Sequence, residues 1–323
     1  MRPLKFHPIL KQTLWGGERI IPYKELASGL SRVGESWELS GMPGSESVVA
    51  EGPWAGSTLS ELIGRFGAEL LGKANYARFG QEFPLLVKFI DAREDLSIQV
   101  HPDDELARKR HGKSGKCEMW YVLEAEPGAS LLTGFSRPIA PAEYERRVAD
   151  NTLTDVLNRQ AIASGDVFYL PAGRVHSIGK GSFIVEIQQS SDITYRIYDF
   201  DRRDAAGNSR ELHTELAREA IDFESSENSR ITYAPENNQE VRLVTTPYFT
   251  TSLYTLTART RCGWSATDSF VAIVLLQGSG SLTDNEGNRI DVRQGETWLL
   301  PASTQWTEIT PHTAPLRLLT SRI

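Results

Sequence analysis

The segment LSIQVHPDD places an amide and an imidazole side chain two residues apart. Its alternating apolar and polar residues predict a β-strand that ends before Pro102. Because side chains alternate across a strand, Gln99 and His101 share one face with Ser97, and aliphatic residues occupy the other. Imidazole is a common ligand of divalent metals, so this polar face is a candidate for metal chemistry.

A second histidine follows a pattern of turn residues in GDVFYLPAGRVHS. Gly165 permits a tight turn into a buried strand, and Pro171 and Gly173 shape the turn after it. His176 is then expected to point into the mouth of a barrel, where it could bind a metal. The segment resembles the second cupin motif, G-x5-P-x-G-x2-H, and departs from it at Lys180, where the motif usually ends in Asn.

Two further segments carry charged side chains on strand faces. If KCEMWYV is a strand, Lys116 and Glu118 share one face, and Cys117 points away into the core. In VEIQQSSDITYR, a strand that continued through Ser191 without a bulge would have one wholly polar face. The residues on that face would be Glu186, Gln188, Ser190, Asp192, Thr194 and Arg196. Such a face suits either a solvent-exposed edge or the lumen of a catalytic barrel.

These segments, taken in order, resemble the type I mannose-6-phosphate isomerases in their short bacterial form. That cupin family has a Q-x-H-P segment, a lysine two residues before a ligand glutamate, and a late S-D-x-x-x-R stretch. The matching segments in this chain are LWGGERI, GESWELSG, LSIQVHPDD, GKCEMWYVL, LPAGRVHSIG and SSDITYRIYDFDR. The resemblance covers nearly the whole chain.

The resemblance implies one zinc ion per chain. Its implied ligands are Gln99, His101, Glu118 and His176. The residue types agree with this, because two imidazoles and one carboxylate suit a borderline divalent metal. Three neutral ligands and one anion leave the site with a charge of about +1, which keeps the metal a Lewis acid.

The resemblance also implies a reaction, the interconversion of mannose 6-phosphate and fructose 6-phosphate through a cis-enediol. Arg196 is the candidate cation beside the negative charge of the intermediate, unless it only pairs with a nearby aspartate. Lys116 is the candidate base that moves the proton, and Asp192 and His101 are the alternatives. For the substrate itself, Lys88 is a candidate phosphate ligand, and Trp15 lines the pocket or is buried in the core.

Composition excludes several other classes of protein. The 323 residues carry a net charge of −7, which argues against nucleic-acid and anionic-lipid partners. Two cysteines are too few for a disulfide framework. Without an apolar run of about 18 residues or a secretory signal, we expect a cytoplasmic protein outside the membrane. The expected partner is a small sugar phosphate, and the chain is a monomer or a homodimer.

Short β-rich runs separated by Gly, Pro and Asp predict a mainly β chain with two cupin (double-stranded β-helix jelly-roll) units. We expect a catalytic metal-binding unit at 1–223 and a C-terminal unit at 240–323 that lacks metal ligands, with a polar linker at about 224–240. Helical spacing predicts insertions in the first unit at about 56–80, 141–160 and 210–222.

An internal repeat supports the two units. GDVFYLPAGRVH at 165–176 has a partner in GETWLLPASTQW at 295–306. Two copies about 130 residues apart indicate a duplicated β unit. The first copy has His176 where the second has Trp306, so we expect the second copy to be structural.

Two other functions remain open from the sequence. A cupin oxygenase with iron usually presents three histidines, and Gln99 in place of the first argues against it. A non-catalytic sugar-binding cupin would have no need for Lys116 and Arg196 beside a metal. The sequence leaves open the identity of the base, the phosphate ligands and the metabolic role.

Overall fold

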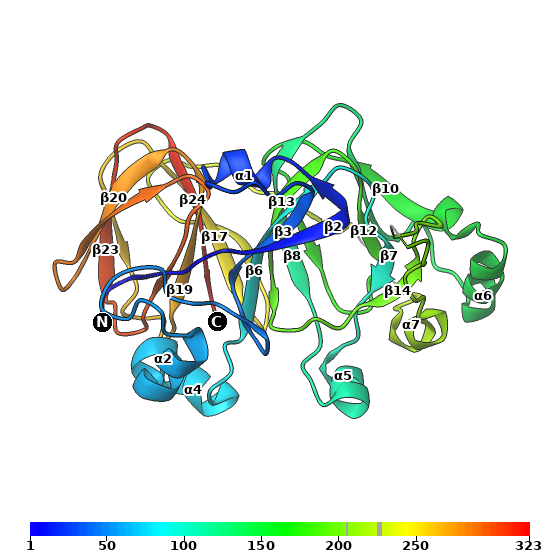
Figure 1. The fold of residues 1–323 in the computed structure, drawn as a ribbon, viewed down its shortest axis with the longest axis horizontal. Helices are drawn as coiled ribbons and strands as arrows, with labels where there is room; N and C mark the ends of the chain where they lie inside the picture. Colours follow the sequence, from blue (N-terminus) through cyan, green and yellow to red (C-terminus); the bar gives the residue numbers. More distant parts are fainter. Residues whose placement is uncertain (205, 225–227) are drawn as a thin grey trace.

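The computed structural model describes residues 1–323 except 205 and 225–227. Four antiparallel sheets of four to seven strands form two β-barrels that lie side by side, and helices cover the outer surfaces (Figure 1). We call the barrel with the seven- and five-stranded sheets the first barrel, and the one with the six- and four-stranded sheets the second barrel. The prediction of a mainly β chain is confirmed.

The first barrel contains most of the first 231 residues. Its seven-stranded sheet has the order β15-β11-β8-β13-β6-β2-β3, with β2 (Ile9–Gly17), β3 (Val33–Leu39), β6 (Leu85–Ala92), β8 (Glu118–Ala125), β11 (Val167–Leu170), β13 (Ser182–Gln189) and β15 (Arg230–Ile231). Its five-stranded sheet has the order β10-β9-β12-β7-β14, with β7 (Ile98–Val100), β9 (Ser130–Phe135), β10 (Leu157–Ala161), β12 (His176–Ile178) and β14 (Tyr195–Tyr198).

The second barrel is built mainly from the C-terminal part of the chain. Its six-stranded sheet has the order β1-β22-β19-β24-β17-β16, with β1 (Leu4–Lys5), β16 (Val241–Thr245), β17 (Thr250–Leu256), β19 (Val271–Gln277), β22 (Thr297–Leu300) and β24 (Leu316–Arg322). Its four-stranded sheet has the order β18-β23-β20-β21, with β18 (Thr260–Gly263), β20 (Ser279–Asp284), β21 (Arg289–Arg293) and β23 (Trp306–Pro311). A separate small hairpin pairs β4 (Gly41–Met42) with β5 (Ser45–Glu46).

Helices occur within each predicted insertion, though they are shorter than the predicted ranges. The helices are α1 (Ile20–Tyr23), α2 (Leu59–Phe66), α3 (Ala68–Leu71), α4 (Lys73–Phe79), α5 (Asp104–His111), α6 (Pro141–Ala149), the 3-10 helix η1 (Leu153–Val156) and α7 (Thr214–Ala220). The last four residues of the predicted 141–160 insertion already belong to strand β10, and residues 230–231 of the predicted linker form β15. Residues 225–227 of that linker lie outside the described residues. Among the described helices, none combines the length and the apolar character that a membrane crossing needs.

Two short strands do not follow the predicted division of the chain. β1 pairs with β22 of the second barrel, with Leu4 opposite Leu299. β15 pairs with β11 of the first barrel, with Ile231 opposite Val167. The division into a catalytic unit at 1–223 and a structural unit at 240–323 stays a prediction, while β1 of the first unit joins a sheet of the second barrel and β15 of the predicted linker joins the first.

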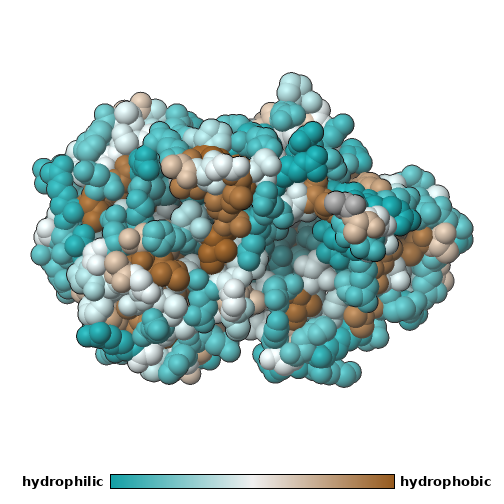
Figure 2. Space-filling model, in the orientation of Figure 1, coloured by the Kyte–Doolittle hydropathy of each residue, from teal (hydrophilic) through white to brown (hydrophobic). Residues whose placement is uncertain are grey.

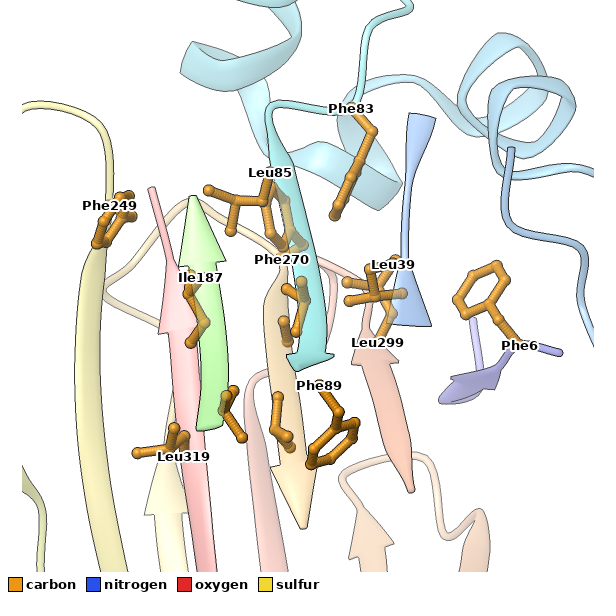
Figure 3. Close-up of a cluster of buried hydrophobic side chains, with 14 of the residues drawn as sticks. Phe6, Leu39, Phe83, Leu85, Phe89, Ile187, Phe249, Phe270, Leu299 and Leu319 are labelled. Atoms are coloured by element: carbon orange, nitrogen blue, oxygen red, sulfur yellow. The ribbon is translucent and has the colours of Figure 1, made fainter. Parts of the chain in front are cut away.

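The two barrels are joined by a layer of buried apolar side chains. In β13 every residue is buried, because Phe183, Val185 and Ile187 pack toward the second barrel while Ile184 faces the interior of the first. Figure 3 shows side chains of both barrels meeting in this layer, and Phe83 and Phe270 pack with ring centroids 4.8 Å apart. Burial of each such side chain contributes about 2 kcal/mol, so the layer fixes the barrels against each other.

The polar strand predicted from VEIQQSSDITYR is interrupted. β13 ends at Gln189, and the chain turns before β14 begins at Tyr195 in the other sheet. The Gln188 amide stabilises the turn by donating hydrogen bonds to Gln189 O (2.8 Å) and Ser191 O (2.7 Å). The single wholly polar face is therefore wrong. Glu186 and Gln188 belong to one sheet, and Thr194 and Arg196 approach the interior from the other.

The internal repeat occupies equivalent places in the two barrels. Gly165 and Gly295 both have a positive φ, of 90° and 79°, at the turns that lead into β11 and β22. A side chain is strained in this conformation, which explains the glycine in both copies. β12 begins with His176, and β23 begins with Trp306, as the two copies predict.

Candidate metal centre and active site

Three side chains from separate strands converge inside the first barrel. The ligand atoms of His101, Glu118 and His176 all lie within 4.8 Å of one another, and all three residues are buried. Glu118 Oε2 is 3.5 Å from His101 Nε2, and Glu118 Oε1 is 3.2 Å from His176 Nε2. Glu118 begins β8 and His101 directly follows β7, and the alternation of both strands directs the two side chains into the barrel, as their spacing predicts.

Backbone carbonyl groups orient both imidazole rings. His101 Nδ1 lies 2.8 Å from Ile193 O, and His176 Nδ1 lies 2.8 Å from Arg174 O. Each Nδ1–H donates a hydrogen bond to its carbonyl oxygen. The lone pair of each Nε2 is therefore free of a proton and faces Glu118. Burial lowers the pKa of His101 to about 3 and also lowers the pKa of His176, so both rings are neutral.

Glu118 supplies the negative charge of the group. Burial opposes its ionisation, but Lys116 and the surrounding imidazoles outweigh burial, and its pKa lies well below the ordinary value. Lys116 Nζ is 3.0 Å from Glu118 Oε2 in a buried ion pair. Because both imidazoles are neutral, we attribute the low pKa of Glu118 mainly to Lys116.

The donor atoms of this group fit a divalent metal. Within the described chain, His101 Nε2 and both carboxylate oxygens of Glu118 are buried without a hydrogen bond, and Oε2 has only its ion-pair contact with Lys116. Buried acceptors without partners are costly, and a cation between the imidazoles and the carboxylate would satisfy His101 Nε2 and Glu118 Oε1. Two imidazole nitrogens and a carboxylate are also the ligands of many zinc enzymes. This is the one group of at least three such donors found among the described residues, and it lies in the first barrel.

Gln99 lies at the edge of the group. Gln99 Nε2 is 3.4 Å from His176 Nε2, and the two residues are opposite each other on β7 and β12. A half-turn of the Gln99 amide would bring its oxygen to the side that faces His176. The structure therefore brings all four predicted ligands together.

A polar cavity opens beside these residues. It has an empty volume of about 540 Å³ including the solvent at its mouth, which is a usual size for a small-molecule site. Figure 2 shows the surface hollowed near the centre of this face. The predicted residues in its wall are Trp15, Lys88, Gln99, Lys116 and Arg196.

An alternating row of charges forms one wall of the cavity. Lys88 Nζ is 2.9 Å from Glu186 Oε1 and 3.6 Å from Glu35 Oε2. Burial disfavours the charge on Lys88, but Glu186 and Glu35 outweigh it and raise the pKa of Lys88. Burial likewise opposes the charge of Glu35, which Lys88 and the indole of Trp37 more than offset, so its pKa is lowered. Lys88 thus already has two carboxylate partners.

The structure does not bring Asp192 into this group. Its carboxylate is 49% exposed and lies 2.9 Å from Lys113 Nζ. The residue falls in the turn between β13 and β14, so the alternation that placed it on the polar face ends before it. Arg196, in contrast, is in register with Gln99 on the neighbouring strand and lines the cavity.

Sequence reasoning missed five polar residues of the cavity wall as site residues: Glu35, Ser97, Glu186, Thr194 and Arg210. The alternation of β13 and of the residues before β14 could have found Glu186 and Thr194, which share a face with predicted residues. Glu35 lies in the segment GESWELSG, where strand alternation also provided a signal. No pattern in the sequence marks Arg210, because it lies in an irregular connection.

Comparison with known proteins assigns this cupin-type fold, with its candidate metal group, to the isomerases. The family described as "Phosphomannose isomerase type I, catalytic domain" matches residues 4–132. The mannose-6-phosphate isomerase ManA of Bacillus subtilis is 34% identical over 303 residues, which cover 93% of each chain. The mannose-6-phosphate isomerase of Streptococcus mutans is 33% identical over 302 residues, covering 93% of this chain and 92% of the relative.

Solved structures agree with this assignment. The mannose 6-phosphate isomerase from Bacillus subtilis matches with a TM-score of 0.90 and 30% identity over 100% of both chains. This chain belongs to the type I phosphomannose isomerase family. The predicted family and its cupin-type fold are confirmed.

Proposed function

We propose that this chain is a zinc-dependent aldose–ketose isomerase that interconverts mannose 6-phosphate and fructose 6-phosphate. The observation that carries the proposal is the buried group of His101, Glu118 and His176, whose free acceptor atoms adjoin a polar cavity. Relatives named mannose-6-phosphate isomerases align with nearly the whole chain, which supports the substrate.

The residues that would hold one zinc ion per chain are Gln99, His101, Glu118 and His176. When bound, zinc would stabilise negative charge on substrate oxygens. Ile193 O and Arg174 O keep the two imidazoles in the tautomer that such a ligand requires. We expect the second barrel to hold no such ion, since the donor group found in the described chain lies in the first barrel.

Lys116 is the residue that we propose to move the proton between C1 and C2. It is buried, it lines the cavity, and Glu118 fixes its Nζ at 3.0 Å. To act as a base it has to lose a proton when the substrate is bound. We assign no proton transfer to Asp192, because its carboxylate pairs with Lys113 at the surface. His101 is also less suited, since its Nδ1–H is held by Ile193 O.

Arg196 is the cation that we propose beside the enediol oxygens. It lies on the inner face of β14, directly opposite Gln99 of β7. Cross-strand neighbours have Cβ atoms about 5 Å apart, so its guanidinium can approach a substrate bound beside Gln99. Trp15 and Lys88 line the same cavity, where Lys88 orders the two carboxylates Glu35 and Glu186.

A coupled assay with mannose 6-phosphate tests the proposal. The purified protein is assayed as isolated, after chelation, and after zinc is added back, and its metal content is measured by mass spectrometry. We expect activity to disappear with the metal and to return with zinc. His176→Gln is expected to lower metal affinity at least about 100-fold, whereas His312→Gln at the surface is expected to leave it unchanged.

The same experiment separates the alternatives. Full activity after complete metal removal would contradict zinc dependence. Oxygen uptake with iron would support a cupin oxygenase, and sugar-phosphate binding without turnover would support a non-catalytic protein. Turnover with Lys116→Ala and Arg196→Ala at the unaltered rate would remove both residues from the proposed mechanism.

A further inference from the structure

Three arginines gather around one carboxylate at the end of β14. Asp199 is buried, and Arg210 donates to it from Nε (2.7 Å to Oδ2) and from Nη2. Arg202 donates to Asp199 Oδ1 from its Nη2 (3.1 Å). Arg196 lies on the strand just before them and is close enough for Arg210 and Arg202 to lower its pKa, after the larger effect of its burial. One carboxylate thus faces three guanidinium groups.

Several donors of these arginines have no acceptor. In the part of the chain that the structure describes, Arg196 Nε and the Nε and Nη1 atoms of Arg202 are buried and make no hydrogen bond. The carboxylate of Glu94 is 4.0 Å from Arg202 Nη1, beyond hydrogen-bond distance, and its side chain is 52% exposed. Buried donors of a charged group are costly when they lack an acceptor. Their arrangement indicates that an anion is the missing partner.

Two of the three arginines line the cavity that opens beside the metal group, and Arg202 lies behind them on Asp199. Arg196 and Arg210 line it together with Gln99 and Lys116. His176, Gln99 and Arg196 are in register on the neighbouring strands β12, β7 and β14. Two strand spacings correspond to about 10 Å, so an anion held by the arginines would lie about that far from His176 across the sheet. The phosphate of a hexose 6-phosphate is likewise at the far end of the molecule from C1 and C2.

We propose that Arg210 and Arg202, beside Arg196, form the subsite that binds the phosphate group of the substrate, a role that rests on the proposed function. The three arginines and Asp199 have a formal charge of +2, which matches a phosphate dianion. Arginine presents a planar set of donors that suits phosphate oxygens. Arg210 uses Nε and Nη2 on Asp199, which leaves Nη1 for the ligand. Lys88, the sequence candidate, is instead held between Glu35 and Glu186.

Substitution of Arg210 and Arg202 tests the subsite. The variants are Arg210→Met and Arg202→Met, and Arg203→Met is the matched control. Arg203 lies in the same connection, is exposed, and donates to Gly207 O (2.8 Å). The zinc-loaded proteins are titrated with inorganic phosphate by calorimetry, and KM is measured with mannose 6-phosphate. We expect Arg210→Met and Arg202→Met to raise the phosphate Kd and the KM by about tenfold or more, with unchanged zinc content, and Arg203→Met to change neither.

The possible outcomes distinguish failure of the proposed phosphate subsite from failure of the proposed function. Phosphate that binds Arg210→Met and Arg202→Met as tightly as the unaltered protein would overturn the subsite, since the anion would then lie elsewhere, at the metal for example. If Arg210→Met shows no cooperative thermal unfolding and is therefore not folded, the result with Arg202→Met decides whether the subsite is correct. Loss of phosphate binding in these variants, in a protein that does not isomerise mannose 6-phosphate, would retain the subsite and reject the proposed function.

Discussion

Lys88 and Glu186 lie opposite each other on β6 and β13, and Lys88 Nζ is 2.9 Å from Glu186 Oε1. Their side chains are only 9% and 4% exposed. The adjacent Glu35 adds a second carboxylate to the same ammonium group. A buried ion pair brings little net stability compared with an apolar pair, but the loss of one partner leaves an uncompensated charge.

Lys88→Met is therefore expected to be strongly destabilising. It leaves Glu35 and Glu186 without their common cation, and we expect the free energy of unfolding in urea at neutral pH to fall by about 3–5 kcal/mol. Lys109→Met, on the exposed face of α5, is the control and is expected to change it by less than about 0.5 kcal/mol. The double variant Lys88→Met with Glu186→Gln should be more stable than Lys88→Met alone. Equal stability of both would show that Glu186 does not depend on Lys88.

Glu296 gives the stability of the protein a dependence on acidic pH. Burial raises its pKa, but Lys5 at 2.6 Å and the indole of Trp298 outweigh burial, and the pKa is lowered from 4.5. The unfolded chain thus binds a proton to Glu296 at a higher pH than the folded protein. The stabilisation is complete above the unfolded pKa and is lost as the pH falls through the folded pKa.

Replacing Glu296 by Gln is expected to flatten this dependence. Urea unfolding of Glu296→Gln between pH 7 and pH 3 should show a smaller loss of stability on acidification than the unaltered protein. Glu51→Gln, at an exposed loop position, serves as the control. If the free energy of unfolding falls equally with pH in all three proteins, other carboxylates determine the loss of stability in acid.

The expectation that the second barrel is structural can be tested by a substitution in its copy of the internal repeat. Trp306→His restores the histidine of the first copy at the start of β23. Because the donor group of His101, Glu118 and His176 has its counterpart nowhere in the described second barrel, we expect zinc to stay at one ion per chain. Isomerase activity should stay within about twofold, and metal analysis with the coupled assay checks both. A second bound zinc ion would show that the second barrel is also a competent metal site.

The apolar layer between the barrels is expected to be a major source of stability. Phe270 is fully buried and packs on Phe83, so Phe270→Ala creates a cavity at the junction. The free energy of unfolding is expected to fall by about 3–5 kcal/mol. Leu212→Ala, where the side chain is 47% exposed, is expected to cost less than about 1 kcal/mol. A similar cost for the two variants would contradict a tightly packed junction.

Strand alternation predicted the metal group well because it depends on local geometry. Gln99 and His101 point inward because their neighbours Ile98 and Val100 pack outward against the α6 and α7 side of the barrel. The glycine and proline pattern before His176 likewise sets a turn whose shape is local. The four candidate ligands come from β7, β8, β12 and the residue after β7. Their convergence on one point was expected only from the family resemblance.

Alternation failed where the chain changed sheets. It placed Asp192 beside Arg196, but the turn after Gln189 separates the strand that holds Glu186 from the strand that holds Arg196. That turn is stabilised by the side chain of Gln188, a contact that no periodic pattern shows. Arg210 lies in an irregular connection, and its place at the cavity depends on Asp199. Contacts of this kind come from tertiary packing and were beyond reach of the sequence pattern.

The pairing of Leu4 with Leu299 has a consequence for biosynthesis. During synthesis, β1 leaves the ribosome almost 300 residues before the strand with which it pairs. At a translation rate of about 5–20 residues per second, β1 waits roughly 15–60 s before it can join its sheet. During this interval the outer face of β6 and β13 is also uncovered, so the nascent chain presents an apolar surface that molecular chaperones recognise.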